Sequence, residues 1–262
     1  MSTLLLRLAG PLQSWGNGSK FERRYTGRTP TKSGVVGMCA SAIGHRRDED
    51  EKIDSIAKLR FGVRIDRPGT LLKDFHTTHE ETFWNPADRS KINHQLTQEK
   101  KNKYSYVTTR YYLSDAAFLV GLEGEDSFLL ELDEALRFPM FPLFLGRRGC
   151  PPEGRVALGV VSVGLCEALQ KQPPVVEMRQ SWNAESAGLR IVMDAVRNIN
   201  DDSPERISGS YLQRDIPLSF NPIHRRFDFR SVCEFEAGAL HLAGNIPDHD
   251  AMSVVEEVTP CL

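Results

Sequence analysis

A chain of 262 residues can bury a sizeable core, and its hydrophobic content of 40% is that of an ordinary globular protein. The near balance of 33 basic and 35 acidic residues excludes a protein that attracts a polyanion through net charge alone. No stretch approaches the roughly 18 uncharged residues of a membrane span, and the N-terminus lacks the pattern of a signal peptide, so we expect no membrane association.

The five cysteines point to a reducing compartment. They are odd in number, widely spaced and without a CxxC pair, which argues against a disulfide framework and against a zinc ribbon. We therefore expect a cytoplasmic protein that holds no metal and no cofactor.

The chain opens on an apolar run at residues 4–8, which predicts a short strand that ends at Gly10 and Pro11. Gln13 and Trp15 would then lie on an irregular loop, where an indole can stack on a base and an amide can read its edge. In the alternative interpretation, this loop is a turn whose tryptophan fills the core. The residues alone leave both interpretations open.

The next segments alternate between helical and strand patterns. Residues 31–43 have helical spacing with Ser33 as a candidate cap, and residues 50–59 form a second amphipathic stretch. Strands are expected at 61–65 and 71–76. The polar stretch 77–103 that follows is typical of a functional excursion between strands.

Two further strands are expected at 104–113 and 116–122, with Ser114 and Asp115 as the turn between them. A helix at 127–136 and a strand at 156–163 complete an order of elements that predicts an α+β, ferredoxin-like unit. After Pro173 and Pro174, strand patterns at 188–193 and 227–235 predict an appended β-rich region, and the chain from 245 onward has the pattern of a frayed tail.

Basic residues gather in three places. The first run holds Lys20, Arg23, Arg24, Arg28 and Lys32, opposed only by Glu22, and the second holds Lys100, Lys101 and Lys103. The third is a loop in which Gly146 and Gly149 flank Arg147 and Arg148. Glycines allow close backbone approach and arginines make bidentate phosphate contacts, so we favour a bound polyanion over arginines that only anchor the loop. The spacing does not fit a nucleoside-triphosphate loop.

Catalysis is the weaker hypothesis. His76 and His79 do not have the HExxH spacing of a zinc site. Tyr25, Lys73 and His76 are the residue types that metal-independent RNA cleavage needs as acid, base and cation, but nothing in the sequence brings them together.

Several separate motifs nevertheless converge on one family. Residues 6–16 (LRLAGPLQSWG), 27–34 (GRTPTKSG), 74–77 (DFHT), 112–118 (YLSDAAF) and 146–151 (GRRGCP) resemble the CasD family, subunits of type I-E CRISPR Cascade complexes that hold the 5′ handle of the guide RNA. The resemblance covers about residues 3–165 and weakens beyond them.

The resemblance implies a RAMP protein with a ferredoxin-like core over residues 1–171, a thumb hairpin inserted at about 77–103, and a β-rich region at 172–262. It implies a non-catalytic subunit that binds crRNA, contacts the backbone subunit CasC and the large subunit CasA, and meets target DNA only through the complex. The alternatives are a metal-independent repeat endoribonuclease, as in type I-C relatives, and a protein scaffold that touches no RNA.

The resemblance and the residue chemistry together give a set of expected contacts. We expect Gln13 and Trp15 to contact handle bases. Phosphates or the 5′ end are expected at Arg24, Arg28, Lys32, Arg147 and Arg148, and further RNA contacts at Tyr25, His76 and Arg110. In the thumb, the expected contacts with RNA or a partner are Phe83, Trp84, Lys100, Lys101 and Lys103.

Overall fold

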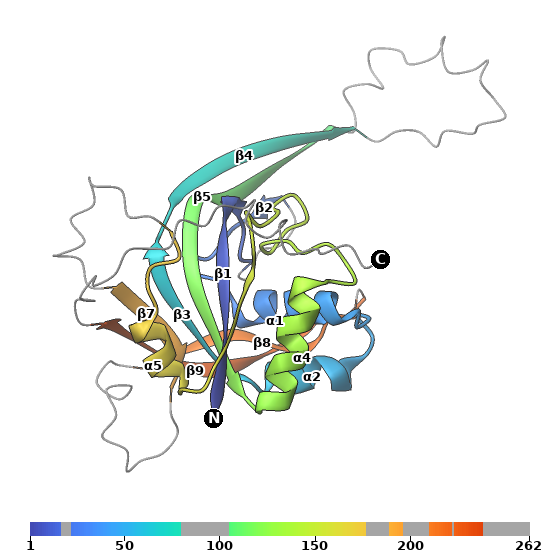
Figure 1. The fold of residues 1–262 in the computed structure, drawn as a ribbon. Helices are drawn as coiled ribbons and strands as arrows, with labels where there is room; N and C mark the ends of the chain where they lie inside the picture. The colour runs from blue at the N-terminus through green and yellow to red at the C-terminus, as the bar shows by residue number, and fades with distance from the viewer. Residues whose placement is uncertain (17–21, 80–104, 177–188, 196–209, 222, 238–262) are drawn as a thin grey trace, which may run out of the picture.

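The computed structural model describes residues 1–16, 22–79, 105–176, 189–195, 210–221 and 223–237 (Figure 1). The strands are β1 (Ser2–Gln13), β2 (Arg23–Arg24), β3 (Arg60–Arg67), β4 (Thr70–His79), β5 (Ser105–Gly124), β6 (Ala157–Val161), β7 (Leu189–Asp194), β8 (Tyr211–Ser219) and β9 (Arg226–Ala237). The helices are α1 (Lys32–Ile43), α2 (Asp50–Ala57), α4 (Asp126–Arg137) and α5 (Leu165–Lys171).

These strands form one sheet with the order β6-β1-β5-β3-β7-β9-β8, and β2 and β4 also pair with β5. The pairs are antiparallel, except that β2 runs parallel to β5. The predicted mixed α and β content with a large sheet is therefore confirmed. The short elements β2 and α5 and the edge strand β8 were not predicted.

Helices cover both faces of the sheet (Figure 1). Leu4, Leu6 and Leu8 of β1 belong to the core under α1, α2 and α4, whereas Leu5 packs with Leu165 of α5 in a second core on the other face. This division follows from the period of two in a strand. Within the described residues, no helix is long and apolar enough to cross a membrane.

Strand β1 does not end at Gly10 and Pro11, as the sequence analysis expected; it continues to Gln13. Gly10 pairs with Ala116 and Leu12 with Ser114, so Pro11 occupies a position where the ladder to β5 has no paired residue. Because proline lacks an N–H, it is tolerated in a strand only where no donor is required.

The expected turn at Ser114 and Asp115 is also wrong, because β5 is one strand of 20 residues. Asp115 has φ +57°, which bends the strand without ending it. Arg67 holds this bend through a hydrogen bond from Nε to the Asp115 carbonyl at 2.7 Å and an ion pair with its carboxylate at 2.7 Å.

Thr31 rather than Ser33 caps α1, since its hydroxyl oxygen accepts a hydrogen bond from the Gly34 N–H at 3.3 Å. A side chain in this position satisfies one of the free donors of the first turn. The corrected cap places the helix start directly after the basic segment that contains Arg28.

A buried ion pair ties the chain after α5 to the sheet. Arg64 pairs with Asp66 at 2.6 Å, and its guanidinium also donates to the carbonyls of Leu169 and Pro173. The Asp66 carboxylate accepts the Val175 N–H at 2.7 Å. The segment after α5 is therefore anchored on β3, the strand with which β7 also pairs.

Candidate RNA interface

The side chains of Gln13 and Trp15 form a closed network at the end of β1. The indole Nε1 of Trp15 donates to Gln13 Oε1 at 3.0 Å, and Gln13 Nε2 donates to the carbonyls of Leu8 and Ala116 at 3.0 and 2.8 Å. Both residues are 0% exposed. The expectation that these side chains contact bases is corrected: they have no face for RNA, and of the two interpretations the buried wedge is the one observed.

Trp15 instead holds together the segments that carry the expected contacts. Its backbone N–H donates to Thr26 Oγ1 at 2.9 Å, and its carbonyl accepts the Gly27 N–H at 2.6 Å. A Cβ on Gly34 would lie 2.9 Å from the indole, so only glycine lets α1 approach this closely. The loop of residues 26–31 and the start of α1 are thus positioned by Trp15.

The arginine loop, residues 146–149, joins the same assembly. Gly146 has φ +83°, and a Cβ there would lie 1.9 Å from the Ser14 carbonyl oxygen. The Ser14 N–H donates to the Leu145 carbonyl at 3.1 Å. The loop therefore lies against the backbone just before Trp15.

Arg147 anchors this loop to the sheet. Its guanidinium donates to the carbonyls of Arg24 at 3.0 Å and of Tyr25 and Tyr111 at 3.4 Å, and its Cζ lies 5.0 Å from the Tyr112 ring centroid. The sequence analysis weighed a polyanion against anchoring. Arg147 serves as an anchor, with carbonyl groups as its partners, and its neighbour Arg148 is exposed.

This packing gathers cations from three segments. Arg24 of β2, Arg28 of the loop before α1 and Arg148 of the arginine loop are all exposed, and none of them forms an ion pair with another described residue. Unpaired guanidinium groups on loops held by a rigid scaffold are suited to phosphate recognition.

Lys32 is not part of this exposed group, which corrects its expected role. It is 4% exposed, and its Nζ forms an ion pair with Asp194 at 3.1 Å. Its backbone N–H donates to Asp215 at 2.8 Å. The sequence suggested a phosphate contact because charge runs do not reveal a partner that is distant along the chain.

A projecting arm extends the sheet above the arginine loop (Figure 1). We define the arm as β2, β4 and residues 105–113 of β5. Because successive side chains of a strand point to opposite sides, the arm has two faces. The register places Asp74 opposite Arg110 and His76 opposite Thr108 on one face, which we call the basic face. Arg24, paired with Arg110, lies on the same face.

The basic face contains polar atoms without hydrogen-bond partners. These are Arg110 Nε, Thr108 Oγ1 and His76 Nε2, although His76 Nε2 lies 2.7 Å from Asp74 Oδ2 at ion-pair distance. Buried polar groups are normally satisfied in native proteins. Arg110 Nε is therefore an unsatisfied donor on this face, whereas His76 is held by Asp74.

The three residues considered for catalysis are not assembled on one face. Lys73 and His76 are three residues apart on β4, so they project from opposite faces of the arm. Tyr25 stacks on Tyr111, which pairs with Lys73, so Tyr25 lies on the face away from His76.

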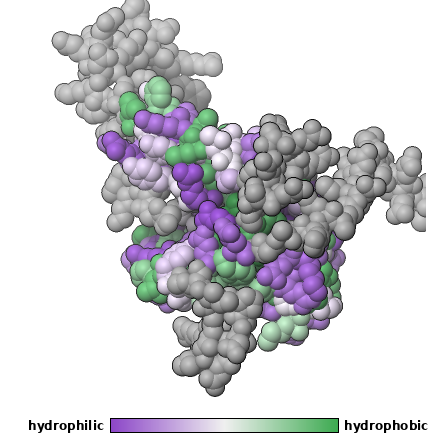
Figure 2. All heavy atoms as spheres, turned by 90° about the vertical axis from the view of Figure 1, so that its left-hand side faces the viewer, coloured by the Kyte–Doolittle hydropathy of each residue, from purple (hydrophilic) through white to green (hydrophobic). Residues whose placement is uncertain are grey.

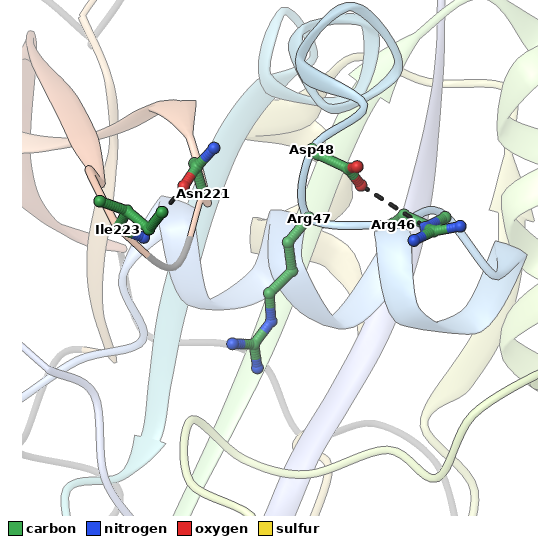
Figure 3. A pocket seen from close by; sticks show the side chains of 5 residues that line it. All are labelled: Arg46, Arg47, Asp48, Asn221 and Ile223. Carbon is green, nitrogen blue, oxygen red and sulfur yellow. Dashed lines mark hydrogen bonds and ion pairs between the residues drawn. The ribbon is translucent and has the colours of Figure 1, made fainter.

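The described cavity lies at a different place, between the α1–α2 loop and the β8–β9 turn (Figure 3). Its volume is about 520 Å³, and it is lined by Arg46, Arg47, Asp48, Asn221 and Ile223. Arg46 pairs with Asp48 at 3.6 Å, and Arg47 points away from that pair. The cavity brings together none of the expected RNA contacts.

Some expected contacts lie outside the described residues. These are the thumb positions Phe83, Trp84, Lys100, Lys101 and Lys103, as well as the expected tail from residue 245. Among the described residues, no group of three or more His, Cys, Asp or Glu side chains could hold a metal ion.

Comparison with known proteins assigns the chain to a class. The family model described as CRISPR-associated protein (Cas_Cas5) matches residues 3–233. The chain therefore belongs to this CRISPR-associated Cas5 family. The resemblance inferred from the sequence motifs is confirmed.

Within the family, the chain is similar to the CRISPR system Cascade subunit CasD of Escherichia coli (strain K12), with 32% identity over 254 residues that cover 90% of this chain and 97% of that protein. A solved structure described as a CRISPR RNA-guided surveillance complex matches with a TM-score of 0.68 and 30% identity, covering 90% of each chain. The crystal structure of a Cas protein matches with a TM-score of 0.65 and 37% identity, covering 90% of this chain and 95% of that one.

Proposed function

We propose that the protein is the crRNA-binding subunit of a type I-E Cascade surveillance complex, where it holds the 5′ handle and caps the backbone filament for antiviral defence. The observation that carries this proposal is the anchoring of Arg147 on the Arg24, Tyr25 and Tyr111 carbonyls. This anchor holds the exposed guanidinium groups of Arg24 and Arg148 on a rigid support. The similarity to a chain of a CRISPR RNA-guided surveillance complex supports crRNA as the ligand.

The architecture proposed is a ferredoxin-like core over 1–171 with a β-rich region at 172–262. The antiparallel order β6-β1-β5-β3, with α1 after β1 and α4 after β5, supports this core, because it is the order of a split βαβ unit. We further propose that residues 77–103, entered from β4 and left into β5, form the thumb. Strands β7, β8 and β9 would extend the core sheet.

We propose CasC and CasA as the protein partners, with the thumb residues facing the guide RNA and CasC. Target DNA would be read by base pairing with the guide, while this subunit supplies contacts to backbone and shape. Cys39 and Cys150 are buried thiols outside any disulfide, which supports a cytoplasmic location.

Within this proposal the subunit binds RNA without cleaving it. The separation of Lys73 and His76 on opposite faces of the arm supports this view. The test is to incubate the purified protein with labelled repeat RNA in the absence of metal ions. Cleavage at one site that disappears in His76→Ala would establish the endoribonuclease instead.

The handle site is tested with Arg24→Ala combined with Arg148→Ala, compared with Arg46→Ala combined with Arg47→Ala at the remote cavity. The first pair should weaken binding of handle RNA and reduce the dependence of log K on log salt by about 0.7 per lost phosphate contact. The control pair should leave both unchanged. Unchanged RNA retention and unchanged complex assembly in the first pair would contradict the proposal.

A further inference from the structure

The second face of the arm carries aromatic rings and cations in adjacent rows. We call it the aromatic face and define it by Lys73 and Phe75 of β4, Thr109 and Tyr111 of β5, and Arg23 and Tyr25 at β2. The register places Lys73 opposite Tyr111 and Phe75 opposite Thr109, which in turn pairs with Arg23. Figure 2 shows hydrophilic and hydrophobic residues side by side along the arm.

Two tyrosines on this face are already stacked. The rings of Tyr25 and Tyr111 have centroids 5.1 Å apart and planes inclined by 16°. Tyr25 is 46% exposed, so its ring remains accessible to a further flat group. A hydrogen bond from Arg23 to Tyr25 orients the ring, and it raises the pKa of the Arg23 guanidinium.

Phe75 provides a second ring in the neighbouring row. It is 69% exposed, although burial of a phenylalanine side chain contributes about 1.5–3 kcal/mol to stability. Its neighbour across the strand, Thr109, is small and polar and leaves the ring uncovered. Leu71, two residues before Lys73 on the same face, is also 45% exposed, and grouped rather than single exposed apolar side chains mark contact surfaces.

We propose that the aromatic face binds unpaired RNA bases by stacking, one base on Tyr25 and one on Phe75, with Lys73 and Arg23 at the flanking phosphates. This inference rests on the proposed function and adds to it a second RNA surface, on the side of the arm away from Arg110 and His76. Sheet-borne aromatic residues that stack bases are a general means of recognising single-stranded RNA.

The charges on this face favour RNA over a protein partner. Lysine is depleted at the centre of protein interfaces, whereas cations between aromatic rings follow the alternation of phosphates and bases along a strand. The acidic residue of β4, Asp74, lies on the opposite face beside His76. The aromatic face therefore presents positive charge and ring surface together.

The test compares two RNA probes, a single-stranded oligoadenylate and the same oligomer with abasic sites, on the full-length protein. Phe75→Ala and Tyr25→Ala should each weaken binding of the oligoadenylate roughly tenfold, with little change for the abasic oligomer. Tyr25→Phe, which keeps the ring but loses the hydrogen bond from Arg23, should bind the oligoadenylate more tightly than Tyr25→Ala does. Leu212→Ala, a substitution of a 71% exposed residue on β8, serves as the control.

The outcomes separate this inference from the proposed function. If Arg24→Ala with Arg148→Ala weakens both probes equally while the ring variants weaken neither, the handle site stands and the aromatic face is overturned as an RNA surface. If the ring variants retain RNA affinity but fail to assemble with the other subunits, the face docks a protein and the inference is again overturned. A selective loss for the base-bearing oligomer in the ring variants supports it even if the arginine pair has no effect.

Discussion

The indole N–H of Trp15 donates to the amide oxygen of Gln13 at 3.0 Å, in an interior where both side chains are completely buried. The same amide donates to the carbonyls of Leu8 and Ala116, so one glutamine joins β1 to β5 and to the tryptophan. The motif at residues 6–16 therefore has a structural role. It sets where the loop before α1 and the arginine loop lie.

Gln13→Leu tests this positioning role. The substitution leaves the Trp15 indole N–H and two carbonyl oxygens without partners, and each unsatisfied buried group costs about 1–3 kcal/mol. We expect urea titrations to show a loss of several kcal/mol of unfolding free energy, because these buried groups lose their partner at the same time. Thr77→Val, on the exposed surface of β4, should change stability by less than about 0.5 kcal/mol. Equal stability of the two variants would contradict the role assigned to Gln13.

Gly146→Ala tests the packing of the arginine loop on the end of β1. The alanine would have to adopt φ +83°, and its Cβ would meet the Ser14 carbonyl oxygen at 1.9 Å. The loop must then move, so we expect weaker RNA binding together with lower stability. Gly149→Ala is the matched control, since a Cβ there meets nothing within 4 Å. RNA affinity that falls equally in both variants would show that the Ser14 contact does not position Arg147 and Arg148.

The long elements could be predicted because their patterns are local. Residues 31–43 repeat apolar side chains at helical spacing, and Phe61, Val63 and Ile65 alternate at strand spacing, although the structure buries both faces of β3. The sequence could not show that β5 continues through Asp115, because that depends on Arg67 from another strand. Turn residues predict a turn only where no distant partner keeps the chain in a strand.

The candidate site was predictable in its segments but not in its individual roles. Glycine and arginine spacing correctly indicated the loops, whereas the burial of Gln13, Trp15 and Lys32 depends on partners far along the chain. Tyr111 and Phe75 were missed as candidate ligand contacts. Alternation along 71–76 could have separated Lys73 and Phe75 from Asp74 and His76, because strand residues two apart share a face.

Asp194→Ala tests the buried charges that hold the start of α1. Asp194 pairs with Lys32 at 3.1 Å and with Arg230 at 2.7 Å, and it accepts the Phe61 N–H at 2.9 Å. Removing one partner of a buried pair leaves uncompensated charge, so we expect a loss of about 3–5 kcal/mol of unfolding free energy.

The exposed pair of Lys171 and Glu167 provides the matched control for Asp194→Ala. Glu167→Ala should cost no more than about 1 kcal/mol, because exposed ion pairs are screened by water. If Asp194→Ala cannot be purified, Lys32→Met takes its place. This variant should lose less unfolding free energy, because Asp194 keeps Arg230 as a partner. A loss for Lys32→Met no larger than that for Glu167→Ala would contradict a structural role for this cluster.

Cys39 should make stability fall at alkaline pH. Burial raises the pKa of its thiol from 9.0 to about 12, so above pH 9 the unfolded chain loses a proton that the folded chain retains. Because the pKa of the thiol is higher in the folded chain, its contribution to stability is complete below pH 9. This contribution is lost as the pH rises toward 12, by about 1.4 kcal/mol per pH unit. Urea titrations at about pH 8 and about pH 10.5 give the change in unfolding free energy between the two pH values. This change should be about 2 kcal/mol larger for the unmodified protein than for Cys39→Ala.

The variant should lose less stability because it lacks the thiol. Comparing the two proteins also cancels the contributions of every other ionisable group. The same change in both proteins would mean that Cys39 ionises without unfolding.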